Sequence, residues 1–173
     1  MRYIGITGNK GSGKTTAARA LEIICQPSFA IGIGDLVIQE VSLAINKKPQ
    51  FILDNKEKFR LLLQAWAHEY RRQLYGEDYW LNKLEHAIHS AGEFKSFTTV
   101  IIPGIRMIRD VTWLKNKQGI LIKMWRSYDA TEDMHVTERE LSMLKADHDV
   151  QNFGTLNELE HKLKYLWERI KND

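Results

Sequence analysis

Eight residues near the start of the chain constrain its fold more than any other feature. The segment 8–15 reads GNKGSGKT and matches G-x-x-x-x-G-K-[ST] at every fixed position. It follows the apolar segment 3–7, which predicts a buried strand, and it leads into the segment 14–24, which predicts a helix. In this setting the glycines let backbone N–H groups point at phosphate oxygens, and the helix adds the positive end of its dipole. The sequence therefore predicts a site for a nucleoside triphosphate.

The residues of this phosphate loop have separate expected roles. Lys14 should reach the β- and γ-phosphates, and the hydroxyl of Thr15 should hold Mg²⁺. The predicted ATP-binding residues of this region are Gly8, Asn9, Lys10, Gly11, Ser12, Gly13, Lys14, Thr15 and Thr16. The motif does not fix the reaction, because GTPases, ATPases and small-molecule kinases share it. A guanine-reading Asn-Lys-x-Asp is not found, since its nearest match, 116–119, has Gly119 in place of the acid.

The composition argues against several other classes of protein. Of 173 residues, 43% are hydrophobic and 27% charged, unlike a disordered or fibrous chain. The net charge of +3 is too small to indicate a nucleic-acid partner, although it suits small anionic ligands. No apolar run approaches the roughly 18 residues of a membrane span, and the N-terminus shows no secretory signal. Cys25 is the single cysteine, so no intramolecular disulfide is expected. We expect one cytoplasmic domain over 1–173, with no membrane partner.

The rest of the chain alternates between strands and helices. Further strands are predicted at 28–33, 97–102, 120–125 and 149–152. Further helices are predicted at 35–45, 56–75, 78–91, 105–117 and 155–170. Loops are predicted at 46–55, 92–96 and 127–136, and capping boxes at 137–140 and 155–158. This alternation predicts an α/β fold in which a parallel sheet is covered on both faces.

Polar residues follow the predicted strands at the points where they end. Asp35 follows the second strand, Arg106 and Arg109 the third, Arg126 the fourth, and the segment 152–154 the fifth. In an open parallel sheet, ligands bind beyond the carboxyl ends of the strands. We therefore expect these side chains to gather near the phosphate loop.

The predicted helix 56–75 carries two stripes of side chains. One stripe is apolar and is expected to be core; it contains Phe59, Leu63, Trp66, Tyr70 and Leu74. The other recurs every four residues on a different face; it contains Arg60, Gln64, His68 and Arg72. This second stripe is either a solvated face or a row of donors for an anionic substrate. Arginine suits the latter role because its planar fork binds phosphate through two hydrogen bonds.

Several segments resemble, in order, those of a known family. Residues 60–64 with Glu69 and Arg72, then 76–80, are similar to R-x-L-L-Q … G-T-E-x-x-R … G-x-D-x-W. Further similar segments are Ile105, Arg106 and Asp110, then 135–138, then 149–156. Together with the phosphate loop they resemble the phage-type deoxynucleoside monophosphate kinases, within the P-loop nucleoside monophosphate kinases, from Ile4 to about Leu163.

The resemblance implies a fold and a reaction. The fold is a P-loop NTPase three-layer sandwich with a five-stranded parallel sheet, a helical monophosphate-binding region at about 35–91, and a lid at about 127–138 that excludes water. The reaction is transfer of the γ-phosphoryl group of ATP, with Mg²⁺, to a deoxynucleoside 5′-monophosphate. A phage-encoded chain would act in the host cell cytoplasm.

The resemblance also implies roles for single residues. Lys14, Arg106 and Arg126 would be catalytic, and Asn152 and Gly154 would border the donor base. The acceptor would be held by Arg60, Gln64, Arg72 and Asp35, with Trp80 either packed near it or in the core.

The sequence departs from the family at a few positions. Gly104 stands where the family commonly has an aspartate, which concerns the metal-side carboxylate. Ala67 and His68 replace Gly-Thr, which concerns the choice of monophosphate, and Arg109 replaces an asparagine.

Two other functions remain open on the sequence alone. The chain could be another small-metabolite P-loop kinase, resembling dephospho-coenzyme A kinase. It could also be a module that binds and hydrolyses ATP while contacting a partner. The sequence leaves open which bases are accepted, whether ATP or GTP is preferred, and the oligomeric state, a homodimer included.

Overall fold

The computed structural model describes residues 1–126 and 144–171, and the chain divides into two compact units. The first, here called the sheet unit, contains Met1–Ile31 and Gly92–Asp173. The second, here called the helical unit, is Gly32–Ala91. The predicted lid at 127–138 and the predicted capping box at 137–140 lie outside the described residues.

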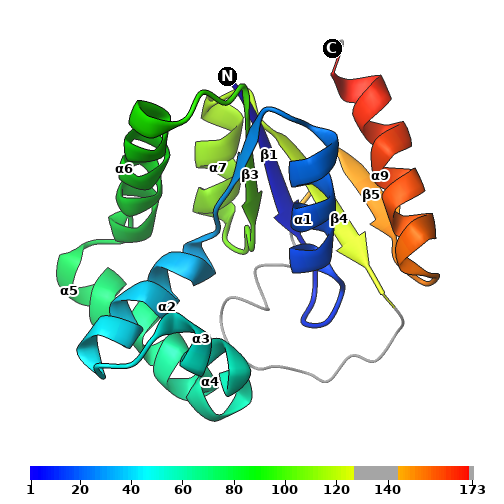
Figure 1. The fold of residues 1–173 in the computed structure, drawn as a ribbon. Coiled ribbons are helices and arrows are strands. Elements are labelled where there is room, and N and C mark those ends of the chain that lie inside the picture. The colour runs from blue at the N-terminus through cyan, green and yellow to red at the C-terminus, as the bar shows by residue number, and fades with distance from the viewer. Residues whose placement is uncertain (127–143, 172–173) are drawn as a thin grey trace. The chain divides into compact units, whose positions relative to one another are not determined.

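The sheet unit is built on five parallel strands (Figure 1). They are β1 (Arg2–Thr7), β2 (Ser28–Ala30), β3 (Thr99–Pro103), β4 (Ile120–Trp125) and β5 (His148–Gln151). Their order in the sheet is β2-β3-β1-β4-β5. The predicted α/β fold with a five-stranded parallel sheet is thus confirmed. Because every strand runs the same way, their carboxyl ends meet at one edge.

Within the described ranges of the sheet unit, helices cover both faces of this sheet. They are α1 (Lys14–Ile24), α7 (Ile108–Asn116) and α9 (Leu156–Ile170). Alternate residues of β1 point to opposite faces. Ile4 and Ile6 belong to a buried apolar cluster that includes Leu21 of α1 and Leu163 of α9. Gly5 faces the other way, where an added Cβ would lie 2.5 Å from Leu114 of α7. The sheet is therefore the middle of three layers.

The helical unit contains a helix that the sequence did not predict. Its elements are α2 (Ile33–Ala44), α3 (Pro49–Asp54), α4 (Lys56–Ala65), the π-helix η1 (Trp66–Arg72), α5 (Gln73–Tyr75) and α6 (Tyr79–Phe94), whose last turn belongs to the sheet unit. The loop prediction for 46–55 was wrong, because α3 occupies most of it. Pro49 begins this helix, at a position where a missing backbone N–H costs nothing.

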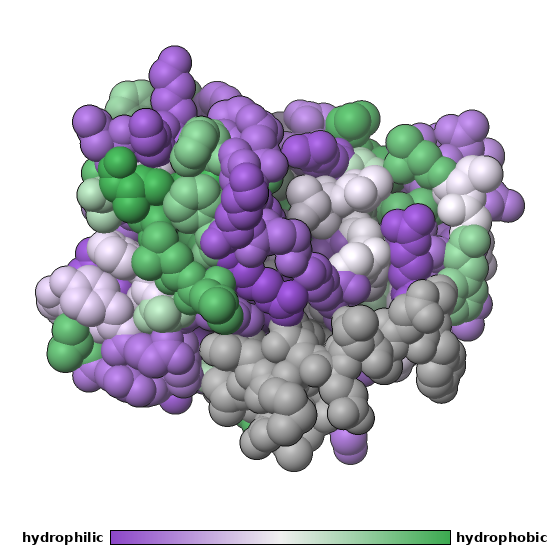
Figure 2. Space-filling view, turned by 90° about the horizontal axis from the view of Figure 1, so that it is seen from below, coloured by the Kyte–Doolittle hydropathy of each residue, from purple (hydrophilic) through white to green (hydrophobic). Residues whose placement is uncertain are grey.

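The predicted helix 56–75 is interrupted by the π-helix. Its apolar stripe was predicted as core, and this was wrong: Tyr70 and Leu74 are 42% and 65% exposed, and the rest of the stripe is half-buried. A turn closed by i→i+5 hydrogen bonds brings Arg71 to the side of Trp66, so the rings on that side pack around a guanidinium instead of an apolar core. Helix α4 buries no residue completely. The space-filling view likewise shows hydrophobic residues at the surface of the molecule (Figure 2).

Other boundaries differ from prediction for local reasons. Strand β2 ends at Ala30, short of the predicted 33, and helix α2 begins at Ile33. Helix α6 runs on to Phe94, into the predicted connection 92–96. The predicted capping box at Thr155 is confirmed, since its hydroxyl accepts a hydrogen bond from the Glu158 backbone N–H. Among the described residues no helix is long and apolar enough to cross a membrane.

Candidate active site

The phosphate loop joins the end of β1 to the start of α1 in the sheet unit (Figure 1). The Nζ of Lys14 donates hydrogen bonds to the carbonyl oxygens of Gly8 and Asn9, each 2.7 Å long. The ammonium group is therefore held over the loop, beside the free N–H groups at the start of α1. Both features favour an anion at this position.

Asn152 is hydrogen-bonded to the phosphate loop. Its Nδ2 donates a 3.0 Å hydrogen bond to the carbonyl oxygen of Ser12, and its backbone N–H donates to Trp125 at 2.6 Å. An added Cβ on Gly13, whose φ is +95°, would lie 2.3 Å from that same Nδ2. The sequence placed Asn152 beside the donor base, whereas its amide here supports the loop. Gly154 lies close to the cap of α9, since an added Cβ would lie 1.8 Å from a Glu158 carboxylate oxygen.

Hydroxyl groups gather in and next to the loop. Thr7 Oγ1 and Ser12 Oγ are buried, and within the described residues neither has a hydrogen-bond partner. Thr15, in the first turn of α1, is exposed. Hydroxyl oxygen is a hard ligand of the kind that Mg²⁺ accepts together with phosphate oxygens and water. The hydroxyl of Thr15 therefore fits the predicted metal role.

The loop after β3 is fastened to the end of β1. The backbone N–H groups of Gly104 and Ile105 donate to the Ile6 carbonyl oxygen at 2.9 and 3.2 Å. Gly104 has a φ of +90°, which favours glycine at this position where the family commonly has an aspartate. The half-buried Arg106 follows, and its backbone N–H donates to Asp110 Oδ2 at 3.1 Å, within the cap of α7. These bonds hold the backbone of Arg106 one strand away from the phosphate loop.

Arg126 lies in the same unit, on the opposite side of β1. It is exposed and directly follows β4, whose Lys123 is paired with Thr7 of β1. Because β3 and β4 are the two neighbours of β1, Arg106 and Arg126 follow the strands on either side of the phosphate loop. That the polar side chains after the strands gather near the phosphate loop stays a prediction.

The remaining predicted residues lie in the helical unit. Arg72 is only 6% exposed, while Arg60, Gln64 and His68 are half-buried. They lie on two adjoining segments, since α4 carries the first pair, Arg60 and Gln64, and η1 carries His68 and Arg72.

Two other residues predicted near the acceptor make contacts within the helical unit. The Asp35 carboxylate accepts a 2.9 Å hydrogen bond from the Gly32 backbone N–H and so caps α2. Trp80 is completely buried, and its Nε1 donates to the Ala67 carbonyl oxygen at 2.9 Å. The core alternative for Trp80 is the one that its burial supports.

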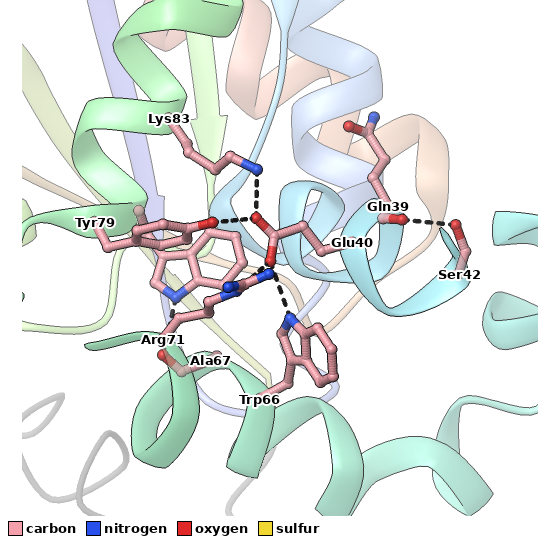
Figure 3. A network of polar contacts seen from close by, with 9 residues as sticks. Gln39, Glu40, Ser42, Trp66, Ala67, Arg71, Tyr79 and Lys83 are labelled. Atoms are coloured by element: carbon pink, nitrogen blue, oxygen red, sulfur yellow. Dashed lines mark hydrogen bonds and ion pairs between the residues drawn. The ribbon is translucent and has the colours of Figure 1, made fainter. Parts of the chain in front are cut away.

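A carboxylate that the sequence analysis missed stands at the centre of the helical unit. Glu40 of α2, whose side chain is 10% exposed, accepts hydrogen bonds from four groups (Figure 3). The donors are Trp66 Nε1 at 3.0 Å, Arg71 Nε at 2.6 Å, the Tyr79 hydroxyl and Lys83 Nζ. Burial alone would raise the pKa of Glu40, but these four hydrogen bonds outweigh it and lower the pKa to about 2.

Aromatic rings surround one of these donors. The Arg71 guanidinium lies 5.0–5.3 Å from the ring centroids of Trp66, Tyr70, Tyr75 and Tyr79. Cation–π attraction stabilises such an arrangement. The density of aromatic residues between 66 and 80 was the available signal in the sequence. It could not reveal Glu40, which lies on another helix.

Comparison with solved structures supports the fold. A Thermus thermophilus protein matches with a TM-score of 0.56 and 17% identity, covering 98% of this chain and 97% of that chain. A shikimate kinase from Aquifex aeolicus matches with a TM-score of 0.51 and 16% identity, covering 98% of each chain. A sugar kinase from Janibacter matches with a TM-score of 0.51 and 15% identity, covering 98% of this chain and 95% of that chain. Identities this low show a shared fold alone.

Comparison of sequences identifies the family. No curated protein matches the sequence. The family model for deoxynucleotide monophosphate kinase matches residues 30–163. The matched range begins after the phosphate loop, so the loop and the family match are separate observations. The chain therefore belongs to the deoxynucleotide monophosphate kinase family and is a phosphotransferase with the fold of the P-loop kinases.

Proposed function

We propose that this protein transfers the γ-phosphoryl group of ATP to a deoxynucleoside 5′-monophosphate, giving the diphosphate and ADP. The observation that supports the proposal is the strand order β3-β1-β4, since Arg106 and Arg126 follow the two strands next to β1, which leads into the phosphate loop. Phosphoryl transfer depends on positioning and on charge neutralisation more than on covalent catalysis. A lysine, two arginines and a row of backbone N–H groups suit that task.

The donor side of the reaction belongs to the sheet unit. The backbone N–H groups of the phosphate loop bind the phosphates of ATP, and Lys14 binds the β- and γ-phosphate oxygens. Thr15 holds Mg²⁺, which when bound neutralises charge on those oxygens. Asn152 keeps the loop in shape through Ser12. Gly154 remains the proposed neighbour of the donor base.

Arg106 and Arg126 act on the group in transfer. As the reaction proceeds, negative charge develops on the leaving oxygen and is spread over the oxygens of the transferred group, while the attacking oxygen loses charge. Guanidinium groups placed in advance stabilise that charge more than they stabilise the ground state. No general base is needed, since an ionised monophosphate oxygen is already a nucleophile.

The acceptor side is assigned to the helical unit. Arg60, Gln64 and Arg72 bind the monophosphate, Arg72 being the one whose position is fixed by burial. Asp35 and Trp80 support these residues through the cap of α2 and the packing of α6. His68, which replaces a threonine of the family pattern, is the proposed source of any difference in base preference.

A panel of acceptors tests the proposal. ADP release is measured with the full chain, ATP and Mg²⁺, in the presence of dAMP, dGMP, dCMP, dTMP, the matching ribonucleotides or dephospho-coenzyme A. We expect turnover that depends on at least one deoxynucleoside monophosphate, with the diphosphate recovered as product. Turnover with dephospho-coenzyme A alone would instead identify another small-metabolite kinase. ADP release that needs no acceptor, or that nucleic acid stimulates, would identify an ATP-hydrolysing module.

A further inference from the structure

We propose that Glu40 is a positioning residue for the monophosphate acceptor, because it holds the segment Trp66–Arg72 in the π-helical register that places Arg72. The inference rests on the proposed function, which assigns Arg72 to the acceptor phosphate. It concerns a residue of α2 that belongs to no motif of the sequence.

The geometry of the π-helix is what allows Glu40 to make its contacts. One carboxylate oxygen, Oε2, accepts from both Trp66 Nε1 and Arg71 Nε (Figure 3). These residues are five apart in the chain. In an α-helix they would lie about 140° apart around the axis, at roughly 100° per residue. A turn closed by i→i+5 bonds brings them to the same side, where one oxygen can reach both.

Glu40 therefore distinguishes the two registers energetically. In the π register its charge is balanced by Arg71 and Lys83, and its oxygens are hydrogen-bonded. In an α-helical register it would lose Trp66 or Arg71 while remaining largely buried. An under-satisfied buried carboxylate is costly, and its charge-assisted hydrogen bonds are the strong ones. The Trp66 ring adds to the preference, because its contact with the Arg71 guanidinium joins the same two residues.

The position of Arg72 depends on the π-helical register of the segment Trp66–Arg72. Arg72 is the next residue after Arg71, it ends the π-helix, and it is only 6% exposed. A change to the α register would turn Arg72 about the helix axis relative to the residues before Trp66. A guanidinium displaced in this way can no longer meet a phosphate held by Arg60 and Gln64 of α4. The phosphate loop belongs to the other unit, so its affinity for ATP should not change.

Steady-state kinetics of Glu40→Gln tests the inference. The variant keeps the shape of the side chain and removes its charge. We expect the KM for the monophosphate to rise about tenfold or more, with the KM for ATP unchanged. Glu160→Gln, an exposed position on α9, is the matched control and should leave both values unchanged. An unchanged KM for the monophosphate in Glu40→Gln overturns the inference, as does an equal rise of both KM values, which indicates general loss of structure.

Further variants separate the register from the fold. Trp66→Phe keeps an aromatic ring but removes the indole N–H, so it should raise the same KM. Lys83→Met removes a donor that lies outside the π-helix, and it should change that KM much less. Arg71→Gln should add little to the effect of Glu40→Gln, because the two substitutions weaken the same ion pair between Arg71 and Glu40. If Glu40→Gln does not fold, Trp66→Phe decides, and a wild-type KM in that variant overturns the inference.

The same experiment distinguishes failure of the two proposals. If the wild-type chain shows no turnover that depends on a monophosphate, the proposed function is wrong, and so is the role of Glu40 in placing the acceptor. If the wild-type chain is active while Glu40→Gln and Trp66→Phe behave as wild type, the proposed function stands and only the role of Glu40 is wrong.

Discussion

The side-chain amide of Asn152 donates a 3.0 Å hydrogen bond to the backbone carbonyl oxygen of Ser12, across 140 positions of the chain. This bond connects the loop after β5 to the phosphate loop after β1. Gly13 makes the approach possible, since any Cβ there would lie 2.3 Å from the same amide nitrogen. The shape of the phosphate loop therefore depends on a residue from the far end of the sheet.

Replacing Asn152 should weaken ATP binding without touching a phosphate ligand. Asn152→Ala leaves the buried Ser12 carbonyl oxygen without its donor, at a cost of about 1–3 kcal/mol. We expect the affinity for ATP, measured by calorimetry, to fall about tenfold, with a lower melting temperature. Asn157→Ala, at an exposed position on α9, is the matched control. Wild-type affinity in Asn152→Ala would show that the loop keeps its shape unaided.

Gly13→Ala should damage the loop more severely than Asn152→Ala. An alanine at a φ of +95° is strained by about 1–2 kcal/mol. Its Cβ must also displace the Asn152 amide, so strain and the lost hydrogen bond add. We expect ATP binding to become undetectable by calorimetry in this variant. Gly34→Ala is the control, because an added Cβ there has nothing within 4 Å and the φ is ordinary. If Gly13→Ala bound ATP as tightly as Gly34→Ala, the close contact between Gly13 and Asn152 would not determine the shape of the loop.

Lys14→Ala should abolish most of the phosphoryl transfer. Its ammonium group is held over the loop by two carbonyl oxygens and is the proposed partner of the β- and γ-phosphates. We expect kcat to fall by a factor on the order of 100–1,000. Circular dichroism should remain that of the wild type, since the two hydrogen bonds of the side chain are to the phosphate loop itself. Lys164→Ala, on the exposed side of α9, should keep full turnover. Near-normal kcat in Lys14→Ala would refute the role.

The sheet was predictable because its signals are local. Strands β1 and β3 are short runs rich in β-branched residues, β4 begins with a short apolar run, and the phosphate loop fixes where β1 ends. Alternation with helices then requires parallel strands, whose carboxyl ends share an edge. Lys14, Arg106 and Arg126 could be placed near one another on that basis alone. Asn152 could be placed at the same edge, but its direction toward Ser12 depends on packing that no local pattern encodes.

The helical unit was less predictable, for two physical reasons. Pro49 was interpreted as a loop residue, although a proline also begins helices. The π-helix Trp66–Arg72 cannot be found with a period of 3.6, because the contacts that favour it come from Glu40 of α2 and Trp80 of α6. In the sequence Glu40 looks like any exposed residue of an amphipathic helix.

The Glu40 network should make the stability of the chain sensitive to acid. Burial acts to raise the pKa of Glu40, but its four hydrogen bonds outweigh burial and lower the pKa from 4.5 to about 2. A lowered pKa means that the carboxylate contributes stability which is complete above about 4.5 and is lost as the pH falls to about 2. We expect the free energies of unfolding of the wild type and Glu40→Gln to differ most at neutral pH and to converge over that interval. Urea unfolding at a series of pH values measures this.

One companion variant checks the cause of that acid sensitivity. Lys83→Met removes one of the hydrogen bonds that lower the pKa of Glu40, so its loss of stability should begin near the same pH, about 4.5, and be complete at a higher pH than in the wild type. A difference between wild type and Glu40→Gln that stays constant from neutral pH to about 2 would show that ionisation of Glu40 does not stabilise the unit.

Cys25 should report on the opening of the helix that follows the phosphate loop. It directly follows α1, it is 1% exposed, and burial raises the pKa of its thiol to about 12, against a smaller lowering by Arg2. The reactive thiolate is therefore scarce in the native protein. We expect a thiol reagent to label the native chain slowly and to label one thiol per chain at once in denaturant. Because ATP binds only the folded loop, saturating ATP should slow native labelling further. Fast labelling without denaturant, or a rate that ATP leaves unchanged, would show that the end of α1 opens independently of the phosphate loop.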